Sequence, residues 1–236
     1  MIGIIGAMEA ELELLRGIMQ DPVEHRIGAF TYSSGTLGKK EAVLLQCGIG
    51  KVQAAVGCAI MLQTFKLTAL INTGSAGGIA QNLHFGDVVI SEGLIYHDVD
   101  VTAFGYLPGQ IPGQPQIFSA DKTLQQLAET AIVNLKQQGR LPARLNYLKG
   151  IIGSGDTFMH EPEKISRLRA TFPTIQAVEM EGAAIAHCCT IFSTPFLVLR
   201  ALSDIAGQES PMKFDEFLPI ASRHSSEIVM ELIQNL

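Results

Sequence analysis

Two kinds of apolar pattern alternate along this chain. Short, mostly apolar runs predict buried strands over residues 2–6, 69–73 and 195–201, and residues 145–154 are interpreted as another strand. Helices, several with apolar residues at helical spacing, are expected over residues 7–19, 48–65, 120–138, 161–170 and 215–236. Segments 29–37, 41–47 and 87–95 are interpreted as further strands. Strands that alternate with helices are typical of α/β proteins. We therefore expect one α/β domain over residues 1–236, with a central mixed twisted sheet flanked by helices on both faces.

One segment fits neither pattern. Residues 102–116 carry three prolines and three glycines, which predict a long irregular loop. Long loops in compact domains are often functional or lie at interfaces.

Two carboxylates stand two residues apart in the otherwise apolar segment 177–186. If this segment begins as a strand, Glu179 and Glu181 point to the same face. Gly182 and the Ala-rich run after it predict a helix, and α/β sheets bind ligands at such junctions. Two carboxylates on one face suit adjacent hydroxyls, as on a ribose. A metal ion, acid–base chemistry and a solvated strand face remain open on spacing alone.

Charge and composition exclude several classes of function. The net charge is −6, and no basic run argues for nucleic acid or an anionic membrane as partner. The first residues lack the basic region of a signal peptide, and no apolar stretch has the length of a membrane span, so we expect a cytoplasmic protein. Only 17% of residues are charged, so much of the surface is either uncharged or covered by a partner. The four cysteines include no CxxC pair and are expected in the core.

Known cofactor and metal motifs are absent from the sequence. Glycines at strand ends form neither GxGxxG nor a P-loop, although together they favour a shared ligand crevice. The run 97–100 has His and Asp, but strand alternation would separate them and no HExxH motif occurs. We expect no metal and no cofactor. Glu11, Asp156 and Asp204 follow strand ends, where two separated acids can act as general acid and base.

Seven motifs, in order along nearly the whole chain, carry a family resemblance. They are Gly3–Glu11, Gly48–Val52, Asn72–Gly78, Asp98–Tyr106, Ser154–Asp156, Val178–Glu181 and Arg200–Asp204. The chain resembles the bacterial 5′-methylthioadenosine/S-adenosylhomocysteine nucleosidases of the purine nucleoside phosphorylase-like superfamily. The resemblance implies a hydrolase that splits the bond between adenine and ribose with water, through an oxocarbenium-like transition state. It also implies a place in methionine salvage and in the removal of inhibitory by-products.

The resemblance also implies roles for individual residues. Asp204 would protonate adenine N7 and accept from the 6-amino group, and Glu11 would activate the water. Glu181 would hold the ribose hydroxyls, with Met180 packed on the sugar and Glu179 assisting. The remaining residues implied to touch substrate or support the site are Met8, Ile49, Ser75, Ala76, Gly77, Phe158, Met159, Arg200, Ser203 and Phe214. Val101, Phe104 and Pro112 would complete the 5′-thio pocket of a neighbouring subunit, which implies a homodimer.

Three other functions remain open. A phosphorylase needs cations for phosphate, yet Asn72 stands where the hexameric bacterial phosphorylases have Arg, and a Glu11 carboxylate would repel phosphate. A menaquinone-pathway relative that hydrolyses aminodeoxyfutalosine shares the same motifs, so the 5′ substituent, including that of 5′-deoxyadenosine, is undecided. The third is a domain that binds a nucleoside without cleaving it, and such a domain would not need both a candidate base and a candidate acid.

Overall fold

The computed structural model describes residues 1–80, 83–205 and 210–236, with side chains from residue 216 onward in the last range. One sheet carries all the described strands, in the order β10-β6-β8-β9-β5-β1-β4-β3-β2, with β7 paired to β6. The strands are β1 Ile2–Gly6, β2 Gln20–Ile27, β3 Phe30–Leu37, β4 Lys40–Gln46, β5 Ala69–Gly78, β6 Val88–Tyr96, β7 Phe118–Ser119, β8 Tyr147–Ser154, β9 Ile175–Glu179 and β10 Phe196–Ile205. Parallel and antiparallel pairs both occur, as predicted.

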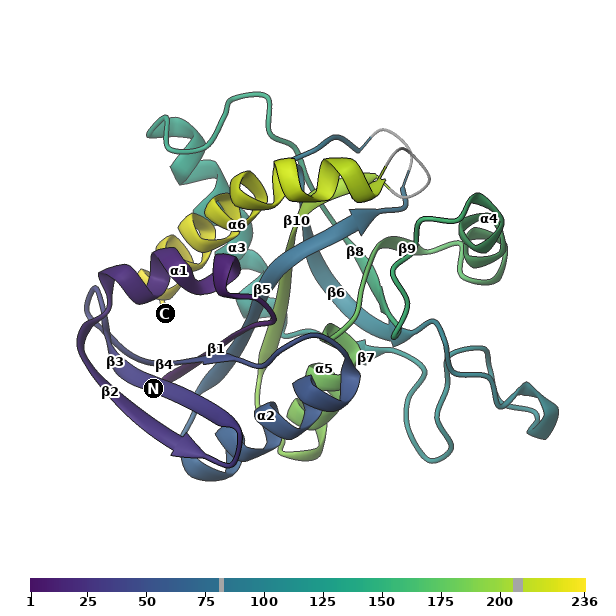
Figure 1. Cartoon of the computed structure of the whole chain (residues 1–236), viewed down its shortest axis with the longest axis horizontal. Coiled ribbons are helices and arrows are strands. Elements are labelled where there is room, and N and C mark those ends of the chain that lie inside the picture. The colour runs from purple at the N-terminus through teal and green to yellow at the C-terminus, as the bar shows by residue number, and fades with distance from the viewer. Residues whose placement is uncertain (81–82, 206–209) are drawn as a thin grey trace.

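Helices cover both faces of the sheet, which confirms the predicted architecture (Figure 1). They are α1 Glu9–Ile18, α2 Lys51–Thr64, α3 Lys122–Gln137, α4 Pro162–Thr171, α5 Gly182–Ile191 and α6 Ser210–Gln234. Helix α6 packs against α1 and α3, and α2 packs against α5 on the other side. No helix in the described ranges is long and apolar enough to cross a membrane.

The sheet closes on itself over part of its width, which the sequence did not predict. Strand β5 pairs with both β10 and β9, while β6 and β8 link those two strands. The ring buries β10 along its whole length, including the polar residues Arg200, Ser203 and Asp204. These pairings also extend β5 to Gly78 and β10 to Ile205, where tight turns and a strand end at Ala201 were expected.

Strand β2 was not predicted. Its sequence is polar and contains Pro22, and nearly all of it is exposed. It pairs only with β3 and lies at the sheet edge, where proline is tolerated because one row of its N–H groups has no partner strand.

The predicted irregular loop is present. Between β6 and β7 the chain has only a short 3₁₀ turn, Thr102–Phe104, and it projects from the body of the molecule at the lower right of Figure 1. Phe104 is 81% exposed at this projection.

Candidate active site

A cavity of about 400 Å³ opens where the carboxyl ends of β1, β5, β9 and β10 come together. Most of the residues singled out from the sequence line it: Met8, Glu11, Ile49, Ser75, Ala76, Gly77, Phe158, Glu179, Met180, Glu181, Ser203 and Asp204. Ala7 and Val178 also line it and were not predicted, although each adjoins a predicted position. The cavity therefore gathers residues from five separate motifs.

Glu11 lies in the first turn of α1 and is held by four donors. Its Oε2 atom accepts from the backbone N–H groups of Ala7 at 2.8 Å and Met8 at 3.1 Å. Its Oε1 atom accepts from the backbone N–H of Ser75 at 2.9 Å and the Ser75 hydroxyl at 3.1 Å. A Cβ at Gly74 would come within 2.7 Å of Glu11 Oε1, so glycine there makes room for the carboxylate. These contacts fix the buried Glu11 side chain in one orientation.

Asp204 comes from β10, beside an irregularity in the strand. The register with β5 shifts between Leu202 and Asp204, so Asp204 pairs with Gly77. Such bulges redirect side chains, often beside active sites. The Ser203 hydroxyl donates to Asp204 Oδ1 at 3.3 Å, and the Asp204 side chain is buried. Asp204 and Glu11 therefore face one cavity from different elements.

The two acids of the 177–181 segment have different surroundings. Strand β9 ends at Glu179, and Glu181 is the residue before α5, with φ −130° and ψ −39°. The strand alternation expected through Glu181 therefore stops two residues earlier. Glu181 accepts from the backbone N–H of Gly50 at 2.8 Å, across the cavity mouth from α2. Burial, and then the charge of Glu179, raise the pKa of Glu181 from 4.5 to about 7.

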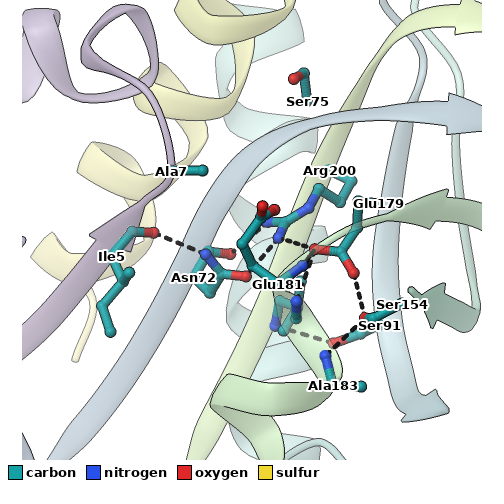
Figure 2. A network of polar contacts seen from close by, with 12 residues as sticks. Ile5, Ala7, Asn72, Ser75, Ser91, Ser154, Glu179, Glu181, Ala183 and Arg200 are labelled. Carbon is teal, nitrogen blue, oxygen red and sulfur yellow. Dashed lines mark hydrogen bonds and ion pairs between the residues drawn. The ribbon is translucent and has the colours of Figure 1, made fainter. Parts of the chain in front are cut away.

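Arg200 lies behind the cavity. Its guanidinium is fully buried and contacts Glu179 Oε2 and Asn72 Oδ1, each at 2.5 Å (Figure 2). Asn72 in turn donates to the carbonyl of Ile5 at 2.9 Å. Burial alone would lower the pKa of Arg200, but the charges of nearby carboxylates, Glu179 first, raise it above its ordinary value. Arg200 is thus a fixed buried cation that does not line the cavity.

The other predicted residues lie outside the cavity lining. Met159 is buried beside Phe158 in an adjoining small hollow. Val101, Phe104 and Pro112 are in the projecting segment, where Phe104 and Pro112 are exposed. The side chain of Phe214 lies outside the described part of the structure.

The rim near α2 is held by an ion pair. Lys51 Nζ contacts Asp98 at 2.5 Å and Asp156 at 3.7 Å, and it lies over the Tyr96 ring. Asp156, singled out as a candidate acid, therefore joins the rim to the start of the projecting segment. Among the described residues, no group of three or more His, Cys, Asp or Glu side chains could hold a metal ion.

The comparisons with known proteins agree with this geometry. A sequence model of the phosphorylase superfamily matches residues 1–234. The 5′-methylthioadenosine/S-adenosylhomocysteine nucleosidase of Actinobacillus succinogenes is 49% identical over 235 residues, which is 100% of this chain and 99% of that protein. A crystal structure of such a nucleosidase from Colwellia psychrerythraea, in complex with adenine, matches with a TM-score of 0.95 and 44% identity, covering 100% of this chain and 95% of that one.

A futalosine hydrolase structure from Helicobacter pylori is more distant. It matches with a TM-score of 0.90 and 31% identity, covering 100% of this chain and 99% of that one. The sequence model shows that this chain belongs to the phosphorylase superfamily, and the full-length relatives show that, within it, the chain belongs to the family of 5′-methylthioadenosine/S-adenosylhomocysteine nucleosidases.

Proposed function

We propose that this protein hydrolyses the N-glycosidic bond of 5′-methylthioadenosine and S-adenosylhomocysteine, and also that of 5′-deoxyadenosine, and releases adenine. The observation that carries the proposal is the placement of Glu11 and Asp204 in one buried cavity together with Glu181. Cleavage of a glycosidic bond with water needs a base for the water, an acid for the leaving group and a hold on the sugar. The cavity offers one carboxyl group for each task.

Glu11 is the base. Of its four donors, three are backbone N–H groups and the fourth is the Ser75 hydroxyl. Only the hydroxyl can rotate away, which frees a lone pair of Glu11 Oε1 for a water molecule. The Glu11 carboxylate then takes a proton from this water as the water oxygen attacks C1′ of the ribose.

Asp204 is the acid that assists departure of adenine. It donates to N7 of the base and accepts from the 6-amino group, so that adenine leaves without carrying a full negative charge. Ser203 supports it by donating to Oδ1. Phe158, which is 41% exposed at the cavity mouth, stacks on the adenine ring, and the Met159 backbone contacts the edge of the base.

Glu181 holds the ribose hydroxyls, with Met180 packed on the sugar. Met8 and Ile49 supply apolar surface around the substrate, as Phe214 also does in this proposal. Ser75, Ala76 and Gly77 line the region of the base and the water.

The charges around the cavity favour water over phosphate as the nucleophile. None of the described residues that line the cavity is Lys or Arg. The nearest buried cation, Arg200, already contacts Glu179 and Asn72. Phosphate would therefore enter beside carboxylates, and no described residue of the lining supplies a cation to bind it. The observations thus favour hydrolysis over phosphorolysis.

A second subunit completes the 5′ side of the site. Phe104 is 81% and Leu107 is 54% exposed on the projecting segment. Val52 and Val56 are exposed four residues apart on α2, and Ile49 is exposed just before this helix, so the three form one apolar patch. Two copies that exchange Val101, Phe104 and Pro112 would cover these surfaces and close the 5′-thio pocket. We include this homodimer, a cytoplasmic location and a role in methionine salvage in the proposal.

The substrate assignment is tested with four nucleosides. We expect adenine release from 5′-methylthioadenosine, S-adenosylhomocysteine and 5′-deoxyadenosine, each measured by chromatography. The fourth substrate is aminodeoxyfutalosine, the substrate of the alternative function. We expect slower cleavage of it, because this chain is 49% identical to a 5′-methylthioadenosine/S-adenosylhomocysteine nucleosidase and only 31% identical to a futalosine hydrolase. A preference for aminodeoxyfutalosine would reverse the assignment.

A further inference from the structure

Glu181 precedes α5 but does not cap it. A Ser, Thr, Asp or Asn residue before a helix often uses its side chain to accept from the first free N–H groups of that helix. Glu181 makes no such bond, and its carboxylate instead accepts from Gly50 at the cavity mouth. The N–H groups at the start of α5 must therefore find acceptors elsewhere.

Two residues from neighbouring strands supply those acceptors. Glu179 Oε2 accepts from the N–H of Glu181 at 3.0 Å and of Gly182 at 2.7 Å. The Ser154 hydroxyl oxygen, at the end of β8, accepts from the N–H of Ala183 at 2.7 Å, and this hydroxyl donates to Glu179 Oε1 (Figure 2). Glu179 and Ser154 thus take over the capping task that Glu181 leaves.

Glu179 is itself held by a chain of buried contacts. Arg200 donates to its Oε2 atom, and Asn72 links Arg200 to the carbonyl of Ile5 on β1 (Figure 2). Each of these contacts is buried, so water does not compete for the groups that make them. Two backbone N–H groups and the Arg200 guanidinium donate to Oε2, and the Ser154 hydroxyl donates to Oε1, so protein groups hold both oxygens of the Glu179 carboxylate.

We propose that Glu179 is a positioning residue: it caps α5 in place of Glu181, which leaves the Glu181 carboxylate free to bind the ribose hydroxyls. Although Glu179 also lines the cavity, its contribution passes through the orientation of Glu181. The inference rests on the proposed nucleosidase function.

The first test is a double substitution. We expect Glu179→Gln to raise KM for 5′-methylthioadenosine roughly tenfold with a smaller change in kcat, because a charge-assisted contact that orients a binding group is lost. In a Glu181→Gln background the same substitution should raise KM less than about twofold, since the residue it orients is no longer a carboxylate. Equal increases in both backgrounds would overturn the proposal.

The pH dependence gives a second readout. The charged or titratable groups that face Glu181 are Glu179, Arg200, Glu11 and Cys47. Burial and the Glu179 charge raise the pKa of Glu181 to about 7, so the wild-type KM should rise as pH falls below this value. Removal of the Glu179 charge lowers that pKa, and the rise should begin at lower pH. The KM ratio of variant to wild type should therefore fall between pH 8 and pH 5.5, and a constant ratio would contradict the proposal.

Matched variants separate positioning from loss of stability. Asp121→Ala removes a comparable cap from α3, where Asp121 accepts from the N–H of Leu124 at 2.9 Å outside the cavity lining. We expect it to lower the melting temperature without changing KM. Ser154→Ala removes one cap contact and one donor to Glu179. It should raise KM by a smaller factor, again only with Glu181 present, and it replaces Glu179→Gln if that variant does not fold.

The wild-type enzyme separates the two claims. A wild type that releases no adenine from 5′-methylthioadenosine would refute the proposed function itself. An active wild type in which Glu179→Gln acts independently of Glu181 would refute only the positioning role.

Discussion

Single side chains at the site are of two kinds: some line the cavity, and others lie behind it and hold the lining residues in place. Glu11, Glu181 and Asp204 line the cavity, whereas Arg200 lies behind it. The motifs predicted nearly all of the lining, because their residues follow strand ends that meet at one place. They could not predict that the Glu179 carboxylate would accept hydrogen bonds from Ser154 and Arg200. Those partners belong to β8 and β10, which come close to β9 only in the folded sheet.

Substitution of either proposed acid–base residue should abolish most of the turnover. We expect Asp204→Asn and Glu11→Gln each to lower kcat by roughly 100-fold or more, the usual contribution of a positioned acid or base. Glu11→Gln also sets an amide against backbone N–H donors, so its melting temperature should fall. Steady-state kinetics on folded protein, checked by circular dichroism, measure the effect. Turnover within tenfold of the wild type in either variant would contradict the assigned role.

The raised pKa of Glu181 should also appear in stability. Its pKa rises from 4.5 to about 7 on folding, so the folded state binds a proton more tightly than the unfolded state. The wild type should therefore lose roughly 3 kcal/mol of stability from this group as pH rises from about 4.5 to 7, with no further loss above. Urea denaturation gives the free energy of unfolding of the wild type and of Glu181→Gln across this range. The difference between the two is the contribution of Glu181. A difference that does not change with pH would show that the group titrates normally.

Several strands and helices could be predicted from their own sequences, because their buried residues form a plain apolar run or a helical pattern. The apolar runs predicted β1 and β10, and helical spacing predicted α1 and α3. Strand β2 escaped prediction because an exposed edge strand needs no apolar alternation. The extension of β5 through its glycines escaped as well, because pairing with β9 and β10 determines it and local sequence does not.

The buried ion pair between β9 and β10 should matter strongly to stability. Arg200→Met leaves the Glu179 carboxylate buried without its cation, which should cost roughly 3–5 kcal/mol of unfolding free energy. Lys149→Met, which breaks a partly exposed pair with Glu129, is the control and should cost less than about 1 kcal/mol. Equal losses in the two variants, measured by urea denaturation, would contradict the role of burial.

The whole molecule carries apolar surface that a single copy leaves exposed. Phe104 projects on the segment between β6 and β7, and Val52 lies on the exposed face of α2. The closed circuit of β5, β10, β6, β8 and β9 could not be predicted from sequence, because it depends on strands distant along the chain.

Assembly should therefore depend on the projecting segment. We expect the wild type to sediment as a dimer, and Phe104→Ser to weaken the dimer and raise KM for 5′-methylthioadenosine roughly tenfold. Val133→Ser changes an exposed apolar side chain on α3 and should alter neither property. Analytical ultracentrifugation with parallel kinetics tests both. A wild type that is monomeric at the assay concentration and fully active would remove the partner from the site.

The most direct test of the account is adenine release from 5′-methylthioadenosine in phosphate-free buffer, repeated with added phosphate, with the sugar product identified. A carboxylate-lined cavity with no cation among its described lining residues predicts the same rate in both buffers and methylthioribose as the product. Release that requires phosphate and yields the sugar 1-phosphate would contradict it, and would mean that this cavity binds an anion beside Glu11.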